Sequence, residues 1–120
     1  MMSVLRTPDE RFADLPAFDH APHYAQIDGL RMHYVDAGPR DAKVVALCLH
    51  GQPSWAYLYR NMIPVFTQGG LRVVAPDWFG FGRSDKPADE AWYSFDRHRD
   101  SMLQLAEPLD LRNVLLVVRD

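Results

Sequence analysis

Three short aliphatic runs, each followed at once by a polar turn, constrain the fold of this chain more than any other feature. The runs lie within residues 43–49, 71–75 and 113–119, and they are rich in Val and Leu. Continuous apolar runs of this length are typical of buried parallel strands, in which both faces of the sheet are covered. We therefore predict three buried strands, each with a polar turn at its carboxyl end.

Helical spacing of apolar residues between the runs indicates that helices join the strands. This spacing extends from Trp55 to Phe66, although Pro64 should kink or shorten that helix because it lacks an amide donor. A second helix should begin near Ser94, which is suited to cap its first turn, and should continue to Leu109. Alternating strands and helices predict an α/β domain with a mostly parallel sheet and right-handed crossovers.

The remaining segments are less regular. Residues 1–26 carry closely spaced prolines and should be irregular, whereas residues 30–35 alternate between apolar and polar side chains, as a half-exposed strand does. The second helix should pack through one face, formed by Phe95, His98, Met102, Leu105 and Leu109. Right-handed crossovers gather the carboxyl ends of parallel strands on one edge, where open α/β sheets bind their ligands. That edge should bring together residues 50–55, residues 77–84 and Asp120.

These turns carry the candidate functional residues. Asp120 follows the last strand, and its position alone fits a helix cap or a strand end as well as a nucleophile. The turn at Gly51, Gln52 and Pro53 favours the nucleophile, because such a turn presents a backbone N–H that can stabilise developing negative charge. We expect His50 to hold this turn through a ring hydrogen bond.

Several other chemistries are disfavoured. The glycine-rich segment after the second run lacks a dinucleotide fingerprint, because Asp85 stands where a third glycine is needed. Ser84 does not fit the pattern Gly-x-Ser-x-Gly, since Lys86 occupies the last position. Asp77 should organise its loop rather than react. We predict neither a metal nor another cofactor, because His and Cys do not recur at metal-ligand spacing. Cys48 should be buried and inert.

The composition argues against further classes of protein. The 120 residues suffice for at most one domain, and 48% hydrophobic with 24% charged residues is typical of soluble globular proteins. A net charge of −3 without a basic cluster argues against nucleic acid as a partner. The apolar runs are far shorter than the roughly 20 residues that span a membrane. The N-terminus lacks a signal-peptide core, so a cytoplasmic location is expected.

Four segments of the chain resemble a known family. They are residues 6–12, 50–60, 76–87 and 109–113. With them, the chain from about Val4 to Asp120 resembles the N-terminal part of the haloalkane dehalogenases in the α/β-hydrolase superfamily. The His-Gly-x-Pro turn is shared with epoxide hydrolases, whereas Arg-Thr-Pro-Asp and Trp-x-Tyr-Leu-Tyr-Arg point to the dehalogenases. The resemblance implies that residues 1–120 form the N-terminal part of one α/β-hydrolase domain, with the cap and C-terminal half absent.

The resemblance also implies roles for individual residues. Asp120 matches the family's nucleophile. In the family this carboxylate displaces halide from a haloalkane and becomes an alkyl ester. Water activated by a histidine then hydrolyses the ester. Gln52 matches a residue whose backbone N–H stabilises the oxyanion and whose side chain, often Asn, contacts the halide. Trp55 is a further candidate for substrate contact. The implied substrate is a small apolar halogenated compound, and the implied reaction uses no cofactor.

Two alternatives stay open: an epoxide hydrolase of the same superfamily, and a non-catalytic piece of a hydrolase. In the dehalogenases the base histidine, the second acid and a halide-binding tryptophan follow the nucleophile. We therefore expect a polypeptide of residues 1–120 alone to be inactive and poorly soluble. Arg119 also departs from the family, which commonly has Gln or His there. The sequence leaves the substrate length, the preferred halogen and the oligomeric state open.

Overall fold

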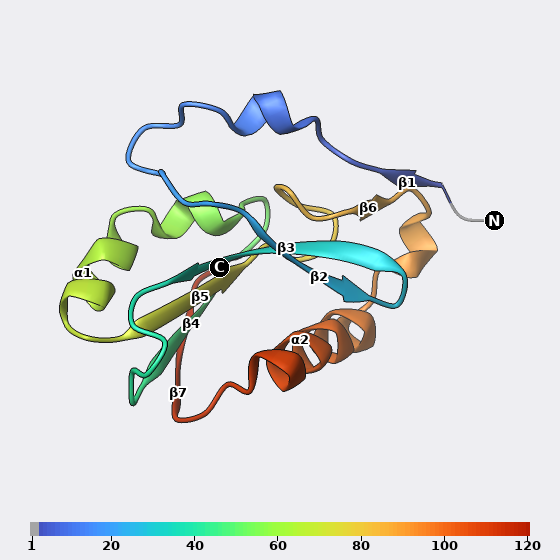
Figure 1. The fold of residues 1–120 in the computed structure, drawn as a ribbon. Coiled ribbons are helices and arrows are strands. Elements are labelled where there is room, and N and C mark those ends of the chain that lie inside the picture. Colours follow the sequence, from blue (N-terminus) through green and yellow to red (C-terminus); the bar gives the residue numbers. More distant parts are fainter. Residues whose placement is uncertain (1–2) are drawn as a thin grey trace.

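Five strands form the central sheet of the computed structural model, which describes residues 3–120 (Figure 1). Their order is β2 (His23–Ile27), β3 (Leu30–Ala37), β5 (Arg72–Pro76), β4 (Val45–Leu49) and β7 (Val114–Val118). β4 pairs in parallel with β5 and with β7, whereas β3 is antiparallel to β2 and to β5. The predicted α/β class is confirmed, and the three aliphatic runs form the parallel part of the sheet.

The sheet is more mixed than predicted, because only two of its four strand pairs are parallel. The difference comes from β2 and β3. β2 forms a hairpin with β3 through a turn at Asp28 and Gly29, both at positive φ, and β3 pairs antiparallel with β5. The expected irregular stretch over residues 1–26 is therefore wrong at its end. Its first residues, Met1 and Met2, lie outside the described part of the chain.

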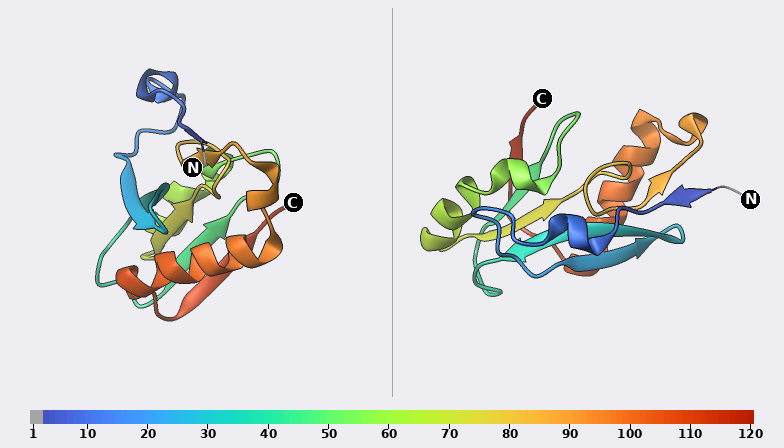
Figure 2. Two further views of the ribbon diagram at one scale, coloured as in Figure 1. Left: turned by 90° about the vertical axis from the view of Figure 1, so that its right-hand side faces the viewer. Right: turned by 90° about the horizontal axis from the view of Figure 1, so that it is seen from above.

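The two α-helices cover opposite faces of the sheet (Figure 2). α1 (Met62–Gln68) packs Ile63 against the face that carries Ala46 and Val73. α2 (Phe95–Leu109) packs Leu105 against the face that carries Leu47 and Val74. Because alternate residues of β4 and β5 enter the two clusters, both faces of these strands are buried, as predicted for continuous apolar runs.

The predicted first helix is divided in two. A 3-10 helix, η2 (Ala56–Tyr59), precedes α1, and Pro64 is the third residue of α1. Proline is tolerated there because the amides of a helix's first turn have no intrahelical acceptor. The prediction that Pro64 shortens the helix is confirmed.

The second helix begins as predicted. The Ser94 hydroxyl accepts a hydrogen bond of 3.1 Å from the Arg97 amide. Of the predicted apolar face, Leu105 is buried and Met102 packs against the same cluster, but Phe95 is 79% exposed. Phe95 is the first residue of α2, so it lies at the end of the helix rather than over the centre of the sheet.

Two strands differ from prediction in their burial. β3 is mostly buried rather than half-exposed, because Met32 and Tyr34 enter one cluster and Val35 the other. β7 pairs with β4 as predicted, but four of its five residues are exposed. It is the last strand in the order of the sheet and therefore has a neighbour on one side only.

A segment before β2 crosses the molecule and braces the loop after β5. Its strand β1 (Val4–Leu5) pairs with β6 (Lys86–Pro87), and a 3-10 helix, η1 (Asp9–Phe12), follows it (Figure 1). A third 3-10 helix, η3 (Glu90–Trp92), leads into α2. Together these contacts keep the loop from residue 77 to residue 87 between the sheet and the N-terminal segment.

Candidate active site

Three neighbouring parallel strands end in the turns that were predicted to carry the candidate functional residues. β4 ends at Leu49, which pairs with Val118 of β7, so the turn after β4 lies beside Arg119 and Asp120. A Cβ atom added to Gly51 would overlap the backbone of Asp120. Only a residue without a side chain therefore permits this approach. The structure brings Asp120 and the turn that contains Gln52 together.

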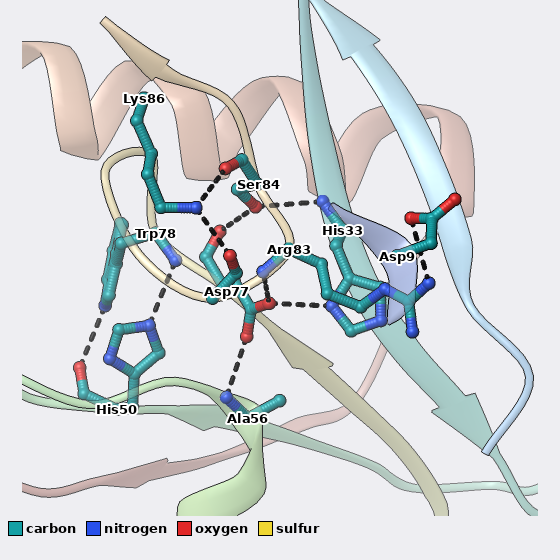
Figure 3. A network of polar contacts seen from close by, with 10 residues as sticks. Asp9, His33, His50, Ala56, Asp77, Trp78, Arg83, Ser84 and Lys86 are labelled. Atoms are coloured by element: carbon teal, nitrogen blue, oxygen red, sulfur yellow. Dashed lines mark hydrogen bonds and ion pairs between the residues drawn. The ribbon is translucent and has the colours of Figure 1, made fainter. Parts of the chain in front are cut away.

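His50 holds the start of this turn, as predicted (Figure 3). Its Nδ1–H donates to the Gly51 carbonyl at 2.8 Å, and its Nε2 accepts the Trp78 amide at 3.0 Å. The Trp78 indole also donates to the His50 carbonyl at 2.9 Å. Burial lowers the pKa of His50, which favours the neutral imidazole that this pattern requires. The turn after β4 is thus tied to the turn after β5.

Asp77 organises the neighbouring turn, also as predicted. Its carboxylate is fully buried and accepts hydrogen bonds from the Ala56 amide at 2.7 Å and the Arg83 amide at 2.9 Å. His33 Nδ1 donates to the same carboxylate at 2.7 Å (Figure 3). Gly82 approaches so closely that a Cβ atom there would collide with this carboxyl group. Three donors, two of them buried, compensate the desolvation of the carboxylate.

His33 is a site residue that the sequence analysis missed. It lies on β3, 2% exposed, and its backbone amide donates to Ser84 Oγ at 2.9 Å. Ser84 Oγ in turn donates to the Asp77 carbonyl at 2.7 Å. Both hydrogen-bonding roles of Ser84 are therefore used inside the fold, in agreement with the prediction that it is not a nucleophile. The polar residue of an alternating strand gave no signal that it faces a buried carboxylate.

The loop after β5 is fastened to the N-terminal segment by ion pairs. Arg6 donates to Asp85 through Nε at 2.6 Å and Nη2 at 2.9 Å, and the Arg31 amide adds a bond of 2.9 Å. Burial tends to raise the pKa of Asp85, but these hydrogen bonds outweigh it and the pKa is lowered. Asp85 therefore remains charged and keeps the loop in place.

Trp55 lies in an aromatic cluster rather than on the cleft. Its ring contacts Phe12, Phe18 and Tyr57 at centroid distances of 5.2, 5.3 and 5.6 Å. The expected substrate contact of Trp55 thus has no geometric support, because packing against the N-terminal segment uses its ring.

A cleft of about 670 Å³ opens beside the turn after β4, between α2 and the exposed β7. Gln52, His50 and Gly51 form one end of it, and apolar residues line most of the remainder. Those residues include Trp78, Phe81, Phe95, Met102, Leu103 and Leu116. Gln52 is exposed and lies at the mouth of the cleft.

Cys48 is buried and carries no free thiolate. It is 0% exposed in the cluster beneath α1, and burial raises its pKa to about 12. The prediction that Cys48 is buried is confirmed. Within residues 3–120, no group of three or more His, Cys, Asp or Glu is arranged to hold a metal ion. No helix of this part of the chain is long and apolar enough to cross a membrane.

A family profile described as the alpha/beta hydrolase fold matches residues 45–119, which include β4, β5, β7 and the turns after β4 and β5. The chain belongs to this family. The α/β hydrolase is 53% identical over 124 aligned residues to a haloalkane dehalogenase of Psychrobacter cryohalolentis. It is 48% identical to one of Mycolicibacterium paratuberculosis. Each match covers 99% of this chain but 41% of the relative, so the chain spans about two fifths of their length.

Solved structures of a haloalkane dehalogenase and an epoxide hydrolase are similar to this α/β hydrolase. The tetrameric haloalkane dehalogenase DpaA from Paraglaciecola agarilytica NO2 superposes with a TM-score of 0.95 at 56% identity, over 98% of this chain and 41% of that one. Epoxide hydrolase VrEH1 from Vigna radiata superposes with a TM-score of 0.77 at 28% identity, and the match covers 85% of this chain and 32% of that one. The expected resemblance to the haloalkane dehalogenases is confirmed.

Proposed function

We propose that this α/β hydrolase contributes the nucleophile and one oxyanion donor to a site that hydrolyses carbon–halogen bonds in small haloalkanes. The observation that carries the proposal is the contact of Asp120 with Gly51, beside Gln52 at the ends of two parallel strands. The high identity to haloalkane dehalogenases over the whole chain supports the same reaction.

The proposed reaction has two steps. In the first, a carboxylate oxygen of Asp120 attacks the carbon that bears the halogen, a C–O bond forms, and halide leaves with the electrons of the C–X bond. In the second, water attacks the carbonyl carbon of the alkyl ester, the alcohol leaves, and the carboxylate is restored. Dividing the reaction in this way replaces one difficult displacement by two easier steps. The base that accepts the water's proton would come from outside residues 1–120.

Gln52 would act in the second step. Attack of water on the ester produces a tetrahedral oxyanion, and a backbone N–H aimed at that oxygen stabilises it. The amide of Gln52 lies in the turn that contacts Asp120, which supports this role. Its exposed side chain could also contact the departing halide, as a longer counterpart of Asn.

An epoxide hydrolase is the second candidate function. The fold similarity to VrEH1 favours it, but at 28% identity compared with 56% for DpaA. Both reactions would use Asp120 as the nucleophile, and they differ in the leaving group and in how that group is stabilised. A direct comparison of an epoxide with a bromoalkane therefore separates the two.

The test is a chimera in which residues 1–120 replace the matching segment of the Psychrobacter cryohalolentis relative. We expect it to release bromide from a short bromoalkane, and the Asp120→Asn variant to release none above background. Asp110→Asn is the matched control, because Asp110 is exposed and at positive φ, which Asn tolerates. A folded chimera that releases no bromide, or an Asp120→Asn variant with full activity, contradicts the proposal. Preferential hydrolysis of an epoxide favours the second candidate.

A further inference from the structure

Two adjacent residues, Asp77 and Trp78, hold both ends of the turn between β4 and η2. We propose that they are positioning residues of the site, which together fix the backbone N–H of Gln52 beside Asp120. This inference rests on the proposed function for its catalytic consequence, but not for the hold itself. The two residues follow β5 directly, so the neighbouring parallel strand determines where they lie.

Trp78 secures the start of the turn through two separate bonds. Its backbone amide donates to His50 Nε2 at 3.0 Å, and its indole donates to the His50 carbonyl at 2.9 Å. The second bond directly restrains the peptide group that connects His50 to Gly51. Trp78 therefore restrains both the ring and the backbone of the residue that opens the turn (Figure 3).

Asp77 secures the end of the turn. Its Oδ1 accepts the Ala56 amide at 2.7 Å, and Oδ2 is occupied by His33 and the Arg83 amide. A fully buried carboxylate cannot exchange such partners for water, so their loss would leave a charge or an amide unpaired. The bond to Ala56 is thus a fixed point rather than a surface contact.

Gln52 lies between the two fixed points and is itself exposed. The direction of its N–H is therefore determined by the ends of the turn and by the approach of Gly51 to Asp120, rather than by burial of its own side chain. An oxyanion donor acts only if it is aimed correctly before the reaction. Loosening either end should slow hydrolysis of the ester, in which the oxyanion forms, more than it slows displacement of halide.

The first readout is amide hydrogen exchange of the chimera, which requires no activity. Trp78→Phe keeps an aromatic side chain and removes the indole donor, and we expect the amides of residues 51, 52 and 54–56 to exchange roughly two- to tenfold faster. Asp77→Asn should give a larger increase, provided that it folds. Trp92→Phe is the matched control, since Trp92 is buried against Phe79 and does not contact the turn. Unchanged exchange in Trp78→Phe overturns the inference.

The second readout separates positioning from general structural damage. In the chimera, rapid quenching and mass spectrometry measure the alkylated Asp120 peptide, while the bromide burst measures the first step. We expect Trp78→Phe to keep the burst and to accumulate alkylated Asp120, with ester hydrolysis slowed about tenfold or more. Equal slowing of both steps, or of neither, contradicts the positioning role. If the unmodified chimera never forms the ester, the proposed function fails, and hydrogen exchange alone decides whether the two residues hold the turn.

Discussion

Replacing Tyr59 by Phe should destabilise the fold through the loss of one buried hydroxyl. Tyr59 is 1% exposed, and its hydroxyl donates to the Leu49 carbonyl at 2.6 Å and lies 3.5 Å from the Val117 carbonyl. It therefore ties together the carboxyl ends of β4 and β7, the strands that carry Gln52 and Asp120. Burial raises the pKa of Tyr59, so the hydroxyl remains a donor at neutral pH.

The size of the effect follows from the lost bond. Removing the hydroxyl leaves the partly buried Leu49 carbonyl without this partner, which costs about 1–2 kcal/mol. With an unfolding entropy of roughly 2.1 cal/mol/K per residue and 120 residues, the Tm should fall by about 4–8 °C. The phenyl ring remains, so packing against Ile63 and Val73 should be kept.

Thermal unfolding followed by circular dichroism measures the change, with urea unfolding as a check on two-state behaviour. Tyr57→Phe is the matched control, because its hydroxyl donates to the Pro16 carbonyl at 3.0 Å on the exposed surface. That variant should lose no more than about 0.5 kcal/mol. If Tyr59→Phe is no less stable than Tyr57→Phe, the reasoning from burial is refuted.

Two further predictions concern pH and self-association. Burial lowers the pKa values of His50 and His98, so as the pH falls these histidines become protonated in the unfolded chain before they do in the folded one. The free energy of unfolding should therefore be highest above about pH 6.5 and decrease below it. An equal or higher urea midpoint at pH 5.5 than at pH 7 would contradict this sign. Val118→Lys on the edge strand should reduce self-association measured by light scattering. Val65→Lys on α1 should not, although Val65 (67%) and Val118 (64%) are exposed to a similar extent.

The parallel part of the fold could be predicted because its signals are local. Each aliphatic run carries its strand assignment in its own residues, and Ser94 marks the start of α2 through a side chain that caps the adjacent turn. The loop-holding roles of His50 and Asp77 could also be inferred, since each stands at the first position after a buried strand. The strand before each of these residues determines where the residue lies.

Other features depended on partners far away in the sequence. β2 was missed because its short segment follows a proline-rich stretch and is specified mainly by pairing with β3. The burial of β3 could not be predicted from alternation, because its polar His33 is satisfied by Asp77, 44 residues later. Trp55 was a candidate for substrate contact through the family resemblance, but the N-terminal segment supplies aromatic partners that hold its ring.

Burial divides the polar residues of the three turns into two groups. His50, Asp77 and Ser84 are buried, and their hydrogen-bonding groups are used to fasten one loop to another. Gln52, in contrast, is exposed, so its polar groups are not consumed in this way. A site needs rigid support and free reactive groups at once, and here different residues of the same turns supply the two. This division is why the positioning roles can be tested by changes at Asp77 and Trp78 that leave the proposed nucleophile itself untouched.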